Sequence, residues 1–179
     1  MAFFEYVPED QVPPEVRDYM EHLRRRGKAG QIGPMYYAFA KYPRLLKALV
    51  QAVDELIPVP NRFGAVQGIA AMLIAHSRGC RPCFDAQRAF LLKLGYDEAA
   101  LNTMCQTPAG LPLSERERRF VEFTFRVARD PEGLKPEEFR EMERTGFSKD
   151  EILEMIGVAA FWNFNTTLHS AVAAGLREG

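Results

Sequence analysis

Apolar residues recur at three- and four-residue intervals along nearly the whole chain of 179 residues. This is the period of a helix that buries one face, and no convincing run alternates apolar and polar residues as a strand does. The pattern therefore predicts an all-α fold. Because there is no low-complexity tract and no long linker, we expect one compact domain over residues 1–179.

Prolines and serines predict where several helices begin. Pro14, Pro34, Pro43 and Pro136 each open a segment with helical periodicity, and proline suits the first turn of a helix because its φ is fixed and it lacks an N–H. Ser114 and Ser148 are each followed by a glutamate three residues later, which matches the capping box. The last helix is expected to run from Ser148 to about Ala174.

Two predicted helices meet near the middle of the chain. The segment from about Phe63 to Ser77 is apolar on most sides, which predicts a buried helix. Gly79 predicts a turn into a second helix, ended by Gly95, that we also expect to be buried. Cys80 lies at this turn.

Composition and charge narrow the classes of partner. The hydrophobic fraction of 47% and the charged fraction of 26% are those of an ordinary globular protein. A net charge of -1 gives no basic surplus for nucleic acid or for an anionic membrane, so small molecules and proteins are the favoured partners. The first ten residues lack the pattern of a signal peptide, and the longest apolar run, Ile69–Ala75, is far shorter than the roughly 20 residues that a span needs. We expect a cytoplasmic protein without a membrane span.

Cys80 and Cys83 form a Cys-x-x-Cys pair, the strongest indication of chemistry in the chain. Free amides and the positive end of the helix dipole favour a thiolate at a helix start, and the thiolate attacks peroxides and disulfides. A disulfide between residues three apart requires Cys80 at the N-cap or in the first turn, since regular helical spacing leaves the Cβ atoms too far apart. Gly79 before the pair and Pro82 within it suit such a start.

Other interpretations of the pair remain open. Zinc needs about four ligands, and besides the pair only His76 and Cys105 could contribute, so we predict no metal and no cofactor. A thioredoxin fold would place the motif after a strand, and no strand is predicted here. Inert packing of both cysteines is a further possibility, and Cys105 is expected to be a small buried hydrophobic residue.

Motifs over most of the chain carry a family resemblance. They are Gly33-Pro34, Tyr42-Pro43-Arg44-Leu45-Leu46, the Cys80-x-x-Cys83 helix ending in Lys93-Leu94-Gly95, Leu113-Ser114-Glu115-Arg116-Glu117, Gly146-Phe147-Ser148-Lys149-Asp150-Glu151-Ile152 and Phe161-Trp162-Asn163-Phe164-Asn165. Together they resemble the alkylhydroperoxidase D-like branch of the carboxymuconolactone decarboxylase family. The resemblance implies an all-helical fold, a homo-oligomer (dimer, trimer or hexamer) and, in the redox members, reduction of peroxides.

The sequence departs from the family's proton relay. In the redox members a glutamate is separated from the Cys-x-x-Cys by eleven residues, a histidine follows the motif after three further residues, and the two relay a proton to the pair. Here these positions hold Gly68 and Gln87, and the position that is histidine between the cysteines of some members holds Pro82. Gln87 lies one helical turn beyond Cys83 and can form hydrogen bonds, but it cannot accept a proton near neutral pH.

Nearby residues are candidates to compensate. His76, at the end of the preceding helix, could be a cation held by the negative helix end, and Arg78, Arg81 and Arg88 could stabilise a thiolate by charge. The simpler interpretation is a helix-end histidine bonding a carbonyl, with the arginines as surface groups; Arg81, inside the motif, is the arginine we retain.

His169 lies in a polar part of the last helix, with Asn163, Asn165, Thr166 and Thr167. Buried polar groups need partners, so this stretch should form hydrogen bonds across helices or line a cavity. Packing in a core or an interface is the favoured interpretation, and His169 is kept as a supporting site residue.

The preferred hypothesis is a thiol-dependent peroxidase or disulfide reductase-like protein. Cys83 would be the attacking thiolate and Cys80 its disulfide partner, with a small hydroperoxide as substrate and an external dithiol as reductant. One alternative is a non-redox, decarboxylase-like enzyme that acts on a small organic acid through a pocket including His76 or His169. Another is an oligomeric binding protein without turnover.

Overall fold

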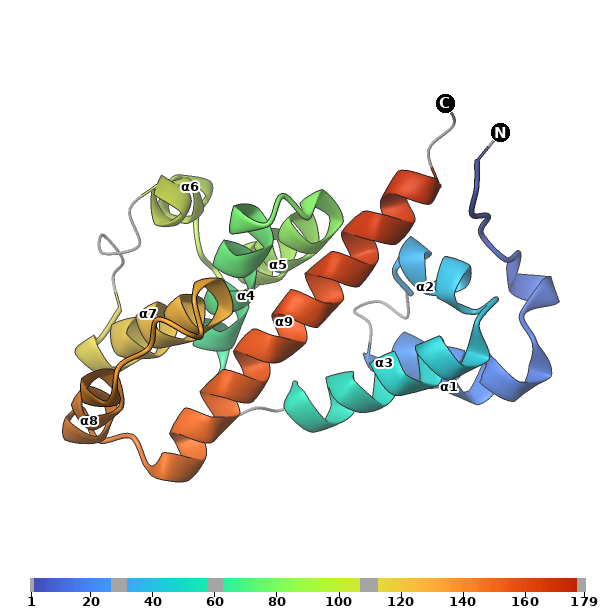
Figure 1. Cartoon of the computed structure of the whole chain (residues 1–179). Helices are drawn as coiled ribbons and strands as arrows, with labels where there is room; N and C mark the ends of the chain where they lie inside the picture. Colours follow the sequence, from blue (N-terminus) through green and yellow to red (C-terminus); the bar gives the residue numbers. More distant parts are fainter. Residues whose placement is uncertain (1, 27–31, 58–62, 107–112, 177–179) are drawn as a thin grey trace. The chain divides into compact units, whose positions relative to one another are not determined.

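The computed structural model describes residues 2–26, 32–57, 63–106 and 113–176. Within these ranges the chain forms α-helices and one short 3-10 helix at Glu9–Gln11, without a β-strand (Figure 1). The α-helices are α1 (Pro14–Arg26), α2 (Pro34–Phe39), α3 (Pro43–Leu56), α4 (Ala65–Ser77), α5 (Arg81–Lys93), α6 (Glu98–Gln106), α7 (Glu115–Arg129), α8 (Pro136–Arg144) and α9 (Lys149–Gly175). The all-α prediction is confirmed.

The helices group into two compact units. One unit contains α1, α2 and α3 with the end of α9 from Leu168, and α3 packs against both α1 and α2. The other unit contains α4 to α8 with α9 up to Thr167, and in it α4 packs against α5, α6 and α7. The single-domain expectation stays a prediction.

The helix starts follow the sequence signals. Each of the four prolines occupies the first position of its helix. The Ser114 hydroxyl accepts a hydrogen bond from the Glu117 backbone N–H, and the Ser114 N–H donates to the Glu117 carboxylate at 2.9 Å. Ser148 and Glu151 form the same pair of bonds at the start of α9. Both predicted capping boxes are confirmed.

Helix α4 is the centre of its unit. Every residue from Val66 to Ala75 is buried, as predicted for a segment that is apolar on most sides. Helix α5 differs, because only Cys83 and Leu91 are buried while its polar side chains reach solvent. The prediction of two buried helices at the cysteine pair is therefore correct for α4 and wrong for α5, which is amphipathic.

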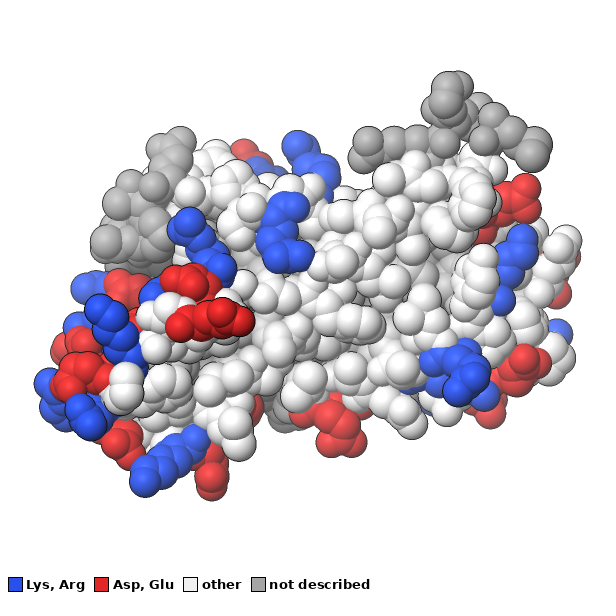
Figure 2. All heavy atoms as spheres, viewed as in Figure 1, with Lys and Arg blue, Asp and Glu red and all other residues white. Residues whose placement is uncertain are grey.

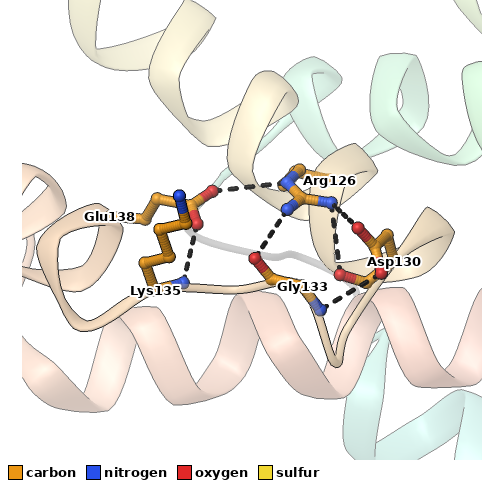
Figure 3. Close-up of polar contacts among 5 residues, drawn as sticks. All are labelled: Arg126, Asp130, Gly133, Lys135 and Glu138. Carbon is orange, nitrogen blue, oxygen red and sulfur yellow. Dashed lines mark hydrogen bonds and ion pairs between the residues drawn. The ribbon is translucent and has the colours of Figure 1, made fainter.

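Charged side chains of both signs are interspersed on α7 and α8, and Figure 2 shows blue and red groups side by side over these helices. The Arg126 guanidinium connects the end of α7 with the turn and helix that follow (Figure 3). It donates to the Asp130 carboxylate at 2.6 Å and to the Gly133 carbonyl at 2.8 Å, and its Nε lies 3.4 Å from the Glu138 carboxylate. These bonds fix the α7–α8 connection.

Candidate active site

Cys80 lies at the junction of α4 and α5. Helix α4 ends in a Schellman motif, in which Gly79 takes a positive φ of 67° and donates its N–H to the His76 carbonyl at 3.1 Å. The Cys80 N–H donates to the Ala75 carbonyl at 3.0 Å, and the Cys80 side chain packs in the same apolar cluster as Ala75. The end of α4 therefore holds Cys80 in place.

The same residue also begins α5. Cys80 is the N-cap, and its carbonyl accepts the first helical hydrogen bond from the Phe84 N–H at 2.9 Å. Pro82 stands in the first turn, as expected for a residue without an N–H. The Cα atoms of Cys80 and Cys83 are 5.4 Å apart and the two sulfurs are bonded as a disulfide. The predicted position of Cys80 and the predicted capacity of the pair to close are confirmed.

The disulfide is almost completely buried, with 1% of Cys80 and 4% of Cys83 exposed. Of the two cysteines, Cys80 lines a pocket of about 550 Å³, which reaches the disulfide from outside. Its walls include the rings of His76 and Phe84 from α4 and α5, and Cys105 from α6. A small molecule in this pocket would meet the Cys80 side of the disulfide first.

His76 lies beside the pair, as expected. Its side chain is exposed, and its ring centroid is 5.4 Å from that of Phe84 at an interplanar angle of 45°. The ring therefore forms an outer wall of the pocket, where a bound molecule can contact it.

The three arginines near the pair have other partners. Arg81 is 83% exposed in its side chain and pairs with Asp85 at 2.9 Å. Arg88 pairs with Glu98, and Arg78 donates to the hydroxyls of Thr166 and Thr167 at 2.9 and 2.7 Å. Because Asp85 balances the Arg81 charge, Arg81 is a weak source of thiolate stabilisation, and its role stays a prediction.

At Gly68, the position that the resemblance assigns to a relay glutamate, neighbouring side chains leave no room for a larger residue. A Cβ atom built on Gly68 would lie 2.9 Å from the Phe90 ring and 3.4 Å from Leu91. The Phe90 ring thus covers the space into which a side chain at position 68 would extend. Gln87 is half-buried on α5, one turn beyond Cys83.

His169 lies in the unit that contains α1 to α3. Its ring packs against Phe39 and Tyr36, with centroids 5.3 and 6.2 Å away. Burial lowers the pKa of His169 to about 4, and its Nε2 has no hydrogen-bond partner among the described residues. In the other unit, Asn163 donates to the Ala128 carbonyl at 2.8 Å, as expected for a polar group that bonds across helices.

Cys105 is a pocket residue whose partial exposure the sequence reasoning missed. The residue was expected to be a buried hydrophobic group, but it is only partly buried and lines the pocket with Cys80. A sequence signal for its helix was available, because Asp97 caps α6 by accepting a hydrogen bond from the Ala100 N–H at 2.8 Å.

The described residues contain no group of three or more His, Cys, Asp or Glu side chains placed to hold a metal ion. Searched over the same part of the chain, no helix has both the length and the apolar character to cross a membrane.

Comparison with solved structures identifies the fold. The chain is similar to a peroxidase-related protein from Silicibacter sp. TM1040, with 19% identity, a TM-score of 0.81 and coverage of 96% of this chain and 90% of that one. It is also similar to an alkylhydroperoxidase AhpD core protein from Ralstonia eutropha JMP134, with 14% identity, a TM-score of 0.83 and coverage of 99% and 92%.

A third similar structure is the debrominase Bmp8, a cysteine-to-alanine variant in complex with 2,3,4-tribromopyrrole. It has 15% identity, a TM-score of 0.78 and coverage of 97% of this chain and 90% of that one. No family model and no curated protein matches the sequence. At these identities the structural likeness establishes the alkylhydroperoxidase D-like fold, which is the fold that the sequence motifs predict.

Proposed function

We propose that this protein is a thiol-dependent peroxidase or disulfide reductase-like enzyme whose reactive group is the Cys80–Cys83 pair. The observation that carries the proposal is a buried Cys-x-x-Cys disulfide at a helix start, reached by a pocket. The disulfide requires no rearrangement of the backbone, since Cys80 already occupies the N-cap of α5. The likeness of fold to peroxidase-related proteins supports the same activity.

The catalytic cycle begins with the reduced pair. Cys83 does not line the pocket, so the hydroperoxide has to pass Cys80 to reach it. The Cys83 thiolate then attacks the outer oxygen of the hydroperoxide, the O–O bond breaks, and the organic product leaves as an alcohol after taking up a proton. Cys83 is then a sulfenic acid. The Cys80 thiol attacks its sulfur, water leaves, and the disulfide forms. The hydroperoxide has thereby been reduced by two electrons from the pair.

An external dithiol returns the pair to the reduced state. Its first thiolate attacks the Cys80 sulfur, because Cys80 lines the pocket, and Cys83 leaves as a thiolate. Its second thiol then displaces Cys80 and becomes oxidised. The helix start favours Cys83 as the leaving thiolate, since it lies in the first turn of α5.

Proton transfer in this chain differs from the relay that the resemblance implies. Gly68 supplies no carboxylate, and Gln87 supplies hydrogen bonds but no proton near neutral pH. His76 places an imidazole in the pocket wall, and imidazole is the side chain most often used as a general acid, here toward the leaving oxygen. We assign it this role.

The proposal includes the setting of the reaction. The substrate is a small hydroperoxide and the reductant is a dithiol. The protein is a homo-oligomer in the cytoplasm, a compartment in which the glutathione and thioredoxin systems keep thiols reduced. Sedimentation of the purified protein measures the oligomer directly and distinguishes a dimer, a trimer and a hexamer from a monomer.

The test is oxidation of the reduced protein by one equivalent of hydrogen peroxide, followed by intact mass and thiol titration. Wild-type protein should lose two hydrogen atoms rapidly, in a reaction that requires both cysteines. Cys80→Ser should stop at a sulfenic acid on Cys83, which a dimedone probe traps, whereas Cys83→Ser should react no faster than a free thiol. Slow oxidation of the wild type would refute the peroxidase proposal.

A second candidate uses the same pair for reductive dehalogenation. The ring walls of the pocket suit a flat aromatic molecule, and the fold is shared with a debrominase. A thiolate would take the bromine of a protonated bromopyrrole as a sulfenyl bromide, and the partner thiol would displace bromide to form the disulfide. Bromide release from tribromopyrrole by the reduced protein tests this reaction. Catalysis that survives Cys80→Ser/Cys83→Ser would instead favour the non-redox alternative on a small organic acid.

A further inference from the structure

The pocket at the disulfide has a second sulfur in its wall. Cys80 contributes from the start of α5, and Cys105 contributes from α6, together with Asn102 one turn earlier on the same helix face. Cys105 is a free thiol and is only partly buried. A disulfide and a thiol therefore share one cavity, and the cycle proposed above gives the thiol no task.

We propose that Cys105 exchanges with the Cys80–Cys83 disulfide. The Cys105 thiolate attacks the Cys80 sulfur, the Cys80–Cys83 bond breaks, a Cys80–Cys105 disulfide forms and Cys83 leaves as a thiolate. The proton that Cys105 loses balances the proton that Cys83 can take up, and the number of disulfides is unchanged. No oxidant or reductant is consumed.

Position and charge select Cys80 as the sulfur attacked. Cys80 lines the pocket that Cys105 also lines. Attack there releases Cys83 in the first turn of α5, where the helix dipole stabilises the leaving thiolate. Burial raises the pKa of the Cys105 thiol, and the nearby Arg88 opposes that rise, so exchange should accelerate as the pH increases.

The exchange requires the Cys105 end of α6 to approach Cys80. A disulfide needs Cα atoms within about 7 Å of each other. Cys105 is the second-last residue of α6, and helix ends fray readily, which allows its backbone to approach Cys80. The chemistry needs only the Cys80–Cys83 disulfide. Its use in turnover rests on the proposed function, because early release of the Cys83 thiolate would free that residue before the external reductant arrives.

The test uses diamide, which oxidises dithiols without peroxidase chemistry. Cys83→Ser leaves Cys80 and Cys105, and we expect diamide to remove two hydrogen atoms and peptide mapping to identify a Cys80–Cys105 disulfide within one chain. Cys80→Ser is the matched control and should form no intramolecular disulfide. Cys83→Ser/Cys105→Ser should likewise lose no hydrogens. Failure of Cys83→Ser to close, while the wild type closes normally, would overturn the proposal.

A measurement on the wild type avoids any effect of substitution on folding. Oxidised protein is held at increasing pH, quenched with acid, and alkylated with N-ethylmaleimide in denaturant. Exchange predicts label on Cys83 as well as Cys105, with the Cys83 share rising with pH. Label confined to Cys105 would refute the exchange. Neither result depends on peroxide, so the exchange can be tested even if the protein has no peroxidase activity.

Discussion

The Cys80 backbone N–H donates to the Ala75 carbonyl, across a glycine of positive φ, and this bond belongs to the end of α4. Cys80 is at the same time the N-cap of α5. One residue thus serves two helix ends, and its side chain direction depends on the conformation of Gly79. The geometry of the dithiol therefore depends on a residue that has no side chain of its own.

Gly79→Ala should disturb the pair specifically. An L-residue in the left-handed region costs about 1–2 kcal/mol, and the new Cβ would meet nothing within 4 Å, so the penalty is conformational. Relief of that strain would move Cys80. We expect a loss of stability of about 1–2 kcal/mol in chemical denaturation and slower closure of the Cys80–Cys83 disulfide by diamide.

Gly146 offers a matched control. It ends α8 in the same Schellman motif, with a φ of 88° and open space around a built Cβ. The Phe147 N–H donates to the Met142 carbonyl, which corresponds to the bond from the Cys80 N–H to the Ala75 carbonyl. Gly146→Ala should lose similar stability without changing the rate of disulfide closure. Equal slowing in both variants would mean that strain at Gly79 does not act through Cys80.

Gly68 and Phe90 should be coupled energetically. A built Cβ on Gly68 comes within 2.9 Å of the Phe90 ring, so Gly68→Ala should destabilise by about 1–3 kcal/mol through overpacking, despite the better helix propensity of alanine. Gly68→Glu should cost more, because it also buries a carboxylate. Denaturation of Gly68→Ala, Phe90→Ala and the double variant measures the coupling, which should be about 0.5–3 kcal/mol. Additive effects would contradict it.

Local signals in the sequence predicted the helix starts and the position of Cys80. Proline at a first turn, Ser114 with Glu117, and glycine before the cysteine pair act over a few residues, so the sequence determines them directly. The contact of Gly68 with Phe90 and the shared pocket of Cys80 and Cys105 join residues more than 20 positions apart. Such contacts depend on how helices pack, which periodicity does not specify.

The partial exposure of α5 has a similar explanation. This helix was expected to be buried, but Phe84, Phe90 and Leu92 are only partly buried. The polar residues of α5 reach solvent, and Arg81 and Asp85 pair there. The existence of the helix was predicted correctly, whereas the depth of its burial depended on its neighbours.

Substitution of Arg81 and substitution of His76 should have different effects on the rate at which peroxide oxidises the protein. Arg81→Ala should change the rate by no more than about twofold, since an exposed ion pair such as Arg81–Asp85 contributes roughly 0.5 kcal/mol. His76→Ala should slow it at least about tenfold, because it removes the proton donor that we assign to the pocket. Stopped-flow oxidation of the reduced proteins measures both rates.

His76→Gln provides the control for these two variants. Glutamine keeps a polar side chain at the pocket wall but donates no proton near neutral pH, so this variant should resemble His76→Ala. Wild-type rates in both would remove His76 from the mechanism. A large effect of Arg81→Ala would show instead that the arginine charge reaches the thiolate despite Asp85.

His169 should make stability depend on pH between about 6.5 and 4. Burial lowers the pKa of the folded-state imidazole from 6.5 to about 4, so the unfolded chain binds a proton first as the pH falls. The stability contribution is therefore complete above pH 6.5 and is lost progressively toward pH 4, by up to about 3 kcal/mol. His169→Phe keeps a ring against Tyr36 and Phe39 and has no proton to bind. Denaturation from pH 4 to pH 7 should give a flatter stability curve for His169→Phe than for the wild type, and parallel curves would show that the imidazole is protonated without cost in the folded protein.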